Sequence, residues 1–168
     1  ATAGSTLHAV DAQGNTEWFA PIAFKVLGYS AGNDILFPTD IWQDINFGSN
    51  ISYNHGNGYS PATSEFVAPQ KGLYNLKSKL TFLSQTYGVR QRLKLRRNGV
   101  VSTIEQSVNN PLDEALSHYT ILLDTDYMLE AGDTAWVESF AIDINSSQII
   151  VSGAADFTWF SGRLITPF

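Results

Sequence analysis

The sequence predicts an all-β fold, either an antiparallel sandwich or a barrel. Apolar and polar residues alternate with the two-residue period of a strand in much of the chain. Turns rich in Gly, Asn and Pro separate these runs, and helical periodicity is scarce. Many short strands without helices are typical of sandwiches and barrels.

The clearest alternation lies in the middle of the chain. In residues 73–82 the side chains of Tyr74, Leu76, Leu80 and Phe82 share one face, and Lys77 and Lys79 lie on the other. Residues 89–97 alternate in the same way, and we expect both segments to be strands. The polar face of the second segment carries Arg90, Arg92, Lys94 and Arg96.

Two turns connect further strands. Asn98-Gly99 follows residues 89–97 and predicts a hairpin, because both central residues of such a turn take positive φ. The segment 130–133, with Gly132 and Asp133, joins the apolar strand 119–129 to the next strand, 134–141.

Length, charge and composition limit the kinds of site and partner that the protein can have. The 168 residues fit one domain with a sizeable core, and the absence of Cys excludes disulfides and thiolate metal sites. The formal charge of −6 argues against nucleic acid as a partner. No stretch is long and apolar enough to span a membrane, and no signal peptide is visible. We expect no nucleic-acid binding and no membrane insertion.

Several motifs occur in an order that resembles the complement-one-q globular domains. Residues 56–76 contain an aromatic residue and then the pattern F-x-A-P-x-x-G-x-Y, ending at Tyr74. The L-x-x-N-G hairpin, the L-x-x-G-D turn and a closing F-S-G strand follow, and 23–28 is similar to the opening strand. The resemblance implies a ten-stranded jelly-roll sandwich of the tumour-necrosis-factor type, usually a homotrimer and often carried on a stalk.

The resemblance also sets the expected domain boundaries. The jelly-roll domain is expected over residues 21–168. Residues 1–20 fall outside the resemblance, and they are either an extra strand or a lead-in from a stalk.

Three basic residues are predicted at the trimer interface. The strand that carries Lys77 and Lys79 resembles one whose outer face meets neighbouring subunits, where lysines need acids of another chain, water or a bound anion. Arg163 stands where the family usually has an aromatic residue, which predicts a more polar contact.

Aromatic residues divide into two groups. Phe66, Tyr74, Trp136 and Phe160 are expected in the core. A carbohydrate site needs an exposed aromatic plane near polar side chains, and the candidates for it are Trp42, Tyr53 and Tyr59.

Basic residues are concentrated in one part of the chain. Eight of the ten Lys and Arg residues lie between Lys71 and Arg97. The stripe of Arg90, Arg92, Lys94 and Arg96 is a candidate site for a polyanion, such as a sulfated or phosphorylated glycan or an acidic protein. The alternative is a solvated outer face that discourages pairing with other strands.

Metal binding and catalysis have weaker signals. Glu105, Asp113 and Glu114 offer oxygen ligands for calcium, and the alternative is a solvated acidic loop. We expect no other cofactor. The sequence has no catalytic motif, and an enzyme acting on carbohydrate would depend on Asp124 and Asp126, which share a strand face.

These observations predict a non-enzymatic homotrimeric head outside the cell or on a virion surface. It would bind a cell-surface glycan or another polyanion, for host attachment or display on a phage fibre, spike or capsid. Its partners would be its own copies, that ligand, and a stalk or virion protein. The alternative is a purely structural trimeric cap or assembly protein.

Overall fold

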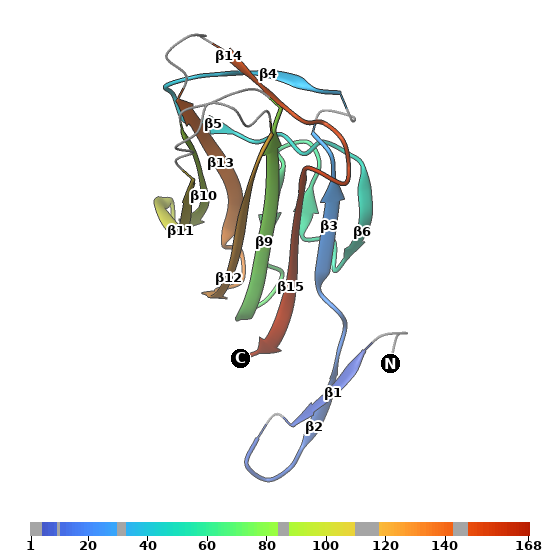
Figure 1. The fold of residues 1–168 in the computed structure, drawn as a ribbon. Coiled ribbons are helices and arrows are strands. Elements are labelled where there is room, and N and C mark those ends of the chain that lie inside the picture. Colours follow the sequence, from blue (N-terminus) through green and yellow to red (C-terminus); the bar gives the residue numbers. More distant parts are fainter. Residues whose placement is uncertain (1–4, 10, 30–32, 84–87, 110–117, 143–147) are drawn as a thin grey trace.

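The chain folds as a β-sandwich with an additional hairpin at its N-terminal end (Figure 1). The computed structural model describes residues 5–9, 11–29, 33–83, 88–109, 118–142 and 148–168. These residues form fifteen strands. The predicted antiparallel sandwich is confirmed, and it has more than ten strands because several of them are short and two belong to the hairpin.

The first layer, called here the β10 sheet, has the strand order β11-β10-β13-β8-β7, with β5 also paired to β13. Every pairing in it is antiparallel. Its strands are β5 (Gln43–Asp44), β7 (Tyr59–Ser60), β8 (Glu65–Val67), β10 (Gly88–Arg97), β11 (Val100–Asn109) and β13 (Thr134–Ile142).

The second layer, the β9 sheet, has the order β4-β14-β9-β15-β3-β6, with β12 also paired to β9. Its pairings are antiparallel as well. Its strands are β3 (Ala23–Leu27), β4 (Ile35–Pro38), β6 (Ile51–His55), β9 (Gly72–Phe82), β12 (Tyr119–Leu129), β14 (Gln148–Val151) and β15 (Trp159–Pro167).

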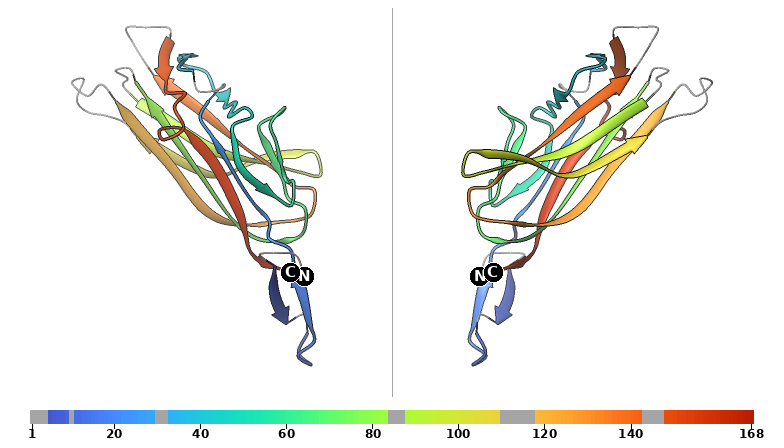
Figure 2. Two further views of the ribbon diagram at one scale, coloured as in Figure 1. Left: turned by 90° about the vertical axis from the view of Figure 1, so that its right-hand side faces the viewer. Right: turned by 90° about the vertical axis from the view of Figure 1, so that its left-hand side faces the viewer.

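The hairpin consists of β1 (Thr6–Ala9) and β2 (Thr16–Phe19), which pair with each other and extend beyond the sandwich near the C-terminus (Figure 2). Leu7 and Trp18 are cross-strand partners, and they are 52% and 58% exposed. From the sequence, we expect residues 1–20 to be either an extra strand or a lead-in from a stalk. The structure forms two strands there, and attachment to a stalk stays a prediction.

The two predicted turns have the backbone that their residues favour. Asn98 and Gly99 have φ of 51° and 78°, which is the left-handed conformation that a tight two-residue hairpin loop needs. Gly132 has φ of 88° in the turn between β12 and β13. The Asn98-Gly99 turn helps to fix the register of β10 against β11, whereas the Gly132 turn carries the chain from β12 in one sheet to β13 in the other.

The core between the sheets is built on a cluster of aromatic rings. Phe24 stacks on Phe66 and Tyr59 with centroid distances of 4.7 and 5.3 Å, and Phe160 meets its edge at 4.9 Å. Tyr74 packs against Phe66. The core positions predicted for Phe66, Tyr74 and Phe160 are therefore confirmed.

The prediction that Trp136 fills the core is wrong. Trp136 alternates with inward-facing Ala135 and Val137, so it lies on the outer face of the β10 sheet. It is nevertheless buried there, because the guanidinium of Arg96 lies over its ring with 5.0 Å to the centroid. Its indole Nε1 donates a hydrogen bond to Asp44 Oδ1 at 2.9 Å.

A buried carboxylate holds the turn between β12 and β13. Asp133 accepts a hydrogen bond from the backbone N–H of Glu130 at 2.8 Å. The guanidinium of Arg97 donates from Nε to the same carboxylate at 2.8 Å and from Nη2 to the Met128 carbonyl at 2.9 Å. The hydrogen bonds to Asp133 raise the pKa of Arg97 above its ordinary value.

We expect Asp133→Ala to lower the free energy of unfolding by about 2 kcal/mol, since hydrogen bonds to charged groups contribute about 1.5–3 kcal/mol and the half-exposed Arg97 can turn to water. Urea denaturation at fixed protein concentration measures this. Glu130→Ala removes a carboxylate from the same turn but keeps the turn's hydrogen bonds, so it is the matched control. Equal effects of the two variants would contradict this role for Asp133.

Candidate functional site

Most of the predicted site residues that the structure describes lie on the two opposite outer surfaces of the sandwich. The cationic face is the outer face of the β10 sheet, and it carries Arg90, Arg92, Lys94 and Arg96 together with Trp42, Trp136, Glu138 and Phe140. The polar face is the outer face of the β9 sheet, and it carries Lys25, Tyr53, Asn75, Lys77, Lys79, Asp124, Asp126, Ser161 and Arg163.

On the cationic face, Arg92 is held between a ring and an acid. Its guanidinium lies over the ring of Trp42, with 3.7 Å to the centroid. It also forms an ion pair with Glu138, its cross-strand neighbour on β13. Trp42 packs against Phe140, and the guanidinium of Arg90 lies over the Phe140 ring. Trp42 therefore packs against the arginine stripe on the same face.

The rest of the stripe is only partly neutralised. Arg96 forms an ion pair with Glu65 at 3.1 Å. Lys94 donates a hydrogen bond to the hydroxyl of Thr103 at 3.2 Å, and among the described residues it has no ion pair. The stripe has four cations and, among the described residues, two carboxylate partners. Its net charge is therefore positive, although smaller than the four charges that the sequence indicates.

One predicted ligand residue is not accessible. Tyr59 is 3% exposed, stacks on Phe24 and donates its hydroxyl to the Gly48 carbonyl at 3.3 Å. Burial raises the pKa of its phenol. Its assignment to a surface carbohydrate platform is therefore wrong, and Tyr59 belongs to the core.

The polar face is organised by strand register. One row runs across five strands through directly paired residues: Tyr53 on β6, Lys25 on β3, Ser161 on β15, Lys77 on β9 and Asp124 on β12. Side chains paired in this way lie close enough to interact. Residues that are far apart in the sequence thus form one surface.

The next row supplies the hydrogen bonds that fix this surface. It contains Arg163, Asn75 and Asp126. The amide of Asn75 donates to Asp124 Oδ1 at 2.8 Å and to Asp126 Oδ1 at 2.7 Å, and Lys77 Nζ bonds Asp124 Oδ2 at 2.6 Å. The sequence interpretation looked for the partner of Lys77 in another chain, water or an anion, whereas the structure places one in the same chain.

The other cations of the polar face have weaker contacts. Lys79 donates to the Asp156 carbonyl at 2.9 Å and lies over the Phe157 ring. Lys25 lies over the Trp159 ring with 5.3 Å to the centroid. Arg163 is exposed, and within the described part of the chain no hydrogen bond or ion pair of its side chain is found.

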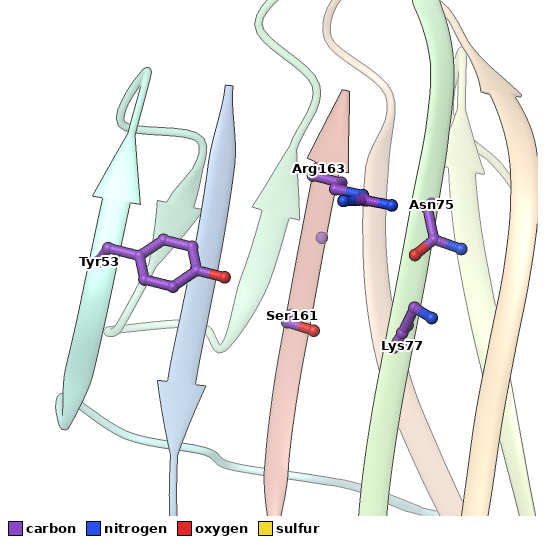
Figure 3. Close-up of a pocket in the computed structure, with 6 residues that line it drawn as sticks. Tyr53, Asn75, Lys77, Ser161 and Arg163 are labelled. Carbon is purple, nitrogen blue, oxygen red and sulfur yellow. The ribbon is translucent and has the colours of Figure 1, made fainter. Parts of the chain in front are cut away.

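A pocket of about 230 Å³ opens on the polar face beside Arg163 (Figure 3). It is lined by Tyr53, Asn75, Lys77, Ser161, Gly162 and Arg163. Figure 3 shows the hydroxyls of Tyr53 and Ser161 on the side that faces β9, with Asn75 and Lys77 opposite them. Side chains from three strands, β6, β9 and β15, therefore line one hollow.

The surroundings of Asp124 do not favour it as the acid of a glycosidase. The two carboxylates share a face, as the sequence indicates, and Asn75 joins them. A glycosidase needs one carboxyl whose pKa is raised so that it can act as the acid. The hydrogen bond from Lys77 instead holds the pKa of Asp124 below its usual value, and the bond from Asn75 lowers it further.

The calcium hypothesis concerns residues that the structure covers only in part. Glu105 lies on β11, while Asp113 and Glu114 lie outside the described residues. Within the described ranges, no group of three or more His, Cys, Asp or Glu residues is placed to hold a metal ion. In the same ranges, no helix is long and apolar enough to cross a membrane.

Solved structures with a similar fold include the following three. Eiger TNF from S. frugiperda is 12% identical with a TM-score of 0.66, over 89% of this chain and 96% of that one. Murine APRIL at pH 8.5 is 12% identical with a TM-score of 0.65, over 88% of this chain and 100% of that one. The globular domain of zebrafish complement 1qA is 17% identical with a TM-score of 0.63, over 88% and 99%.

These likenesses confirm the predicted jelly-roll fold. No curated protein matches the chain. The family model for the C1q domain matches residues 30–165, which is most of the sequence. The chain therefore belongs to the C1q-domain family, the complement-one-q family that its motifs resemble.

Proposed function

We propose that this chain is a homotrimeric recognition head whose polar face forms the subunit contact and whose cationic face binds an anionic ligand. C1q and tumour-necrosis-factor-like domains are generally non-catalytic binding modules that typically form homotrimers, usually outside the cell. The ligand proposed here is a cell-surface glycan or another polyanion.

The observation that carries this proposal is the separation of the two sets of residues. Lys77, Lys79 and Arg163 lie on the outer face of the β9 sheet, while the arginine stripe lies on the outer face of the β10 sheet. Assembly through the polar face leaves the cationic face exposed. The trimer would then present three copies of the stripe, and multivalent binding raises the overall affinity without new contacts.

The cationic face has features of a site for sulfated or carboxylated chains. Lys94 has no acidic partner among the described residues, and Arg92 and Trp42 form a stacked pair beside it. Guanidinium groups bind oxyanions in a bidentate manner, and aromatic planes pack against sugar rings. A setting on a fibre, spike or capsid, with attachment to a host surface, fits such a head.

A structural cap without a soluble ligand is the second candidate. The ion pairs of Arg92 with Glu138 and of Arg96 with Glu65 favour it, because they use part of the stripe's charge within the sheet. In this case trimer formation would be the whole function.

A binding assay separates the two candidates. We expect the wild-type trimer to bind immobilised dextran sulfate, more tightly at low salt, and not to bind uncharged dextran. Lys94→Glu should weaken this binding at least fivefold without changing the solution mass, because it reverses a charge that has no acidic partner in the described part of the chain. Lys71→Glu makes the same charge change on a residue outside both faces, and it is the control.

Loss of binding in both variants alike would show that only net charge matters and would contradict a site on the cationic face. A wild-type trimer that does not bind dextran sulfate would support the second candidate, a structural cap. A wild-type mass of one chain would overturn the proposed assembly.

A further inference from the structure

The pocket on the polar face combines a cation that has no ion pair among the described residues with several hydrogen-bond donors. The strands β3, β6, β9, β12 and β15 place four cations but only two carboxylates on this face. Lys77 is paired with Asp124, whereas the guanidinium of Arg163 has no hydrogen bond or ion pair among the described residues. Beside the larger effect of the hydrogen bond from Lys77, its charge helps to lower the pKa of Asp124, but its hydrogen-bond donors have no acceptor among the described residues.

The orientation of Asn75 and Lys77 keeps the two acids away from the hollow. Both Asp124 and Asp126 lie on β12, beyond β9 as seen from the pocket, and neither lines it. The Asn75 amide nitrogen is turned toward these acids, so its carbonyl oxygen is left toward the pocket (Figure 3).

The donors that remain match a planar group with two negative oxygens. Arg163 offers the fork of a guanidinium, which binds a carboxylate through two parallel hydrogen bonds. The hydroxyls of Tyr53 and Ser161 have no hydrogen bond within the described ranges, and both line the same hollow. The ring of Tyr53 stacks on His55 with 5.8 Å between the ring centroids.

The size of the pocket limits its occupant. A volume of about 230 Å³ is below the roughly 300–1,000 Å³ of sites for drug-sized ligands. The pocket is therefore large enough for one functional group and the atoms attached directly to it.

We propose that this pocket binds a carboxylate, held by Arg163 with the hydroxyls of Ser161 and Tyr53. The carboxylate belongs either to a free small acid or to an acidic side chain of a second copy of the chain. The second source rests on the trimer proposed above. Charge favours it, because a chain of net charge −6 with two positive sheet faces must carry its excess of acidic residues outside those faces.

The test uses acetate as the probe and a conservative series at one position. Arg163→Lys keeps the positive charge but removes the forked guanidinium, and Arg163→Met removes both the charge and the guanidinium. Lys71→Met is the control, because it removes one exposed positive charge outside both faces. Because Arg163 is exposed, these variants should fold, which circular dichroism checks. Acetate binding is read by saturation-transfer difference NMR in chloride buffer, and assembly by sedimentation equilibrium.

A free-acid site predicts saturation transfer to acetate in the wild type and in Lys71→Met, reduced at least fivefold in Arg163→Met and partly in Arg163→Lys. A site for a second copy predicts no transfer to acetate. It predicts instead a trimer dissociation constant at least tenfold higher in Arg163→Met than in Lys71→Met.

The proposal is overturned if Arg163→Met matches Lys71→Met in both measurements. It is also overturned if Arg163→Lys equals the wild type in both, because charge alone would then be sufficient and no fork would be bound. A monomeric wild type would contradict the trimer but would leave the acetate measurement to decide the pocket, so the two failures are distinguishable.

Discussion

Phe24→Ala should lower the free energy of unfolding by about 3–5 kcal/mol, the range found for removing a buried phenylalanine ring. Phe24 is fully buried and contacts three other rings, which come from β7, β8 and β15. Its ring therefore bridges the two sheets, and its loss leaves a cavity that rigid neighbours cannot fill. Chemical denaturation at one protein concentration is the measurement, since assembly adds to apparent stability.

Phe168→Ala is the matched control for this prediction. It removes the same ring from a residue that is 70% exposed at the end of the chain. Its effect on the unfolding free energy should stay within about 0.5 kcal/mol. If Phe24→Ala were as mild as Phe168→Ala, the ring cluster would not be the centre of the core.

The local signals in the sequence predicted strands and turns well, because those features depend on neighbouring residues. Asn98-Gly99 dictates a tight hairpin, and the alternation in 89–97 separates the inward from the outward side chains. The order of family motifs then gave the jelly roll, which the family match and the similar structures confirm.

The position of Trp136 could also have been inferred from alternation. Trp136 stands two residues before Glu138, so both share a face of β13, and Glu138 does not belong in a core. The continuous apolar character of the segment hid this pattern. Tyr59 is the opposite case, because β7 has only two residues and offers no alternation from which to infer burial.

The partners of the charged residues could not be predicted, since they depend on pairing between distant strands. Lys77 on β9 meets Asp124 on β12, which is 47 residues later in the sequence, and Arg92 meets Glu138, which is 46 residues later. No local pattern fixes such register. The pocket beside Arg163 has the same origin, because it requires β6, β15 and β9 to be placed in the right order.

Gly162→Val tests the close approach of β15 to the core. A Cβ atom at Gly162 would lie 2.5 Å from Phe24 Cε1 and 2.6 Å from Leu76 Cδ2, and both of these side chains are fully buried. Real Cβ atoms essentially never come so close, so the rings or the strand must move. We expect a loss of unfolding free energy at the upper end of about 1–3 kcal/mol, measured by chemical denaturation.

Ser161→Val is the control, because it places the same side chain on the adjacent residue, which points outward to the polar face. A mild effect of Ser161→Val beside a severe effect of Gly162→Val would attribute the loss to overpacking rather than to valine in a strand. Combining Gly162→Val with Leu76→Ala should cost less than the sum of the two changes, because the shorter side chain vacates the space that the new one needs. Strict additivity would mean that the clash is relieved elsewhere, by a shift of β15. Such a shift would also displace Ser161 and Arg163, so the glycine that packs β15 against the core would then position the pocket as well.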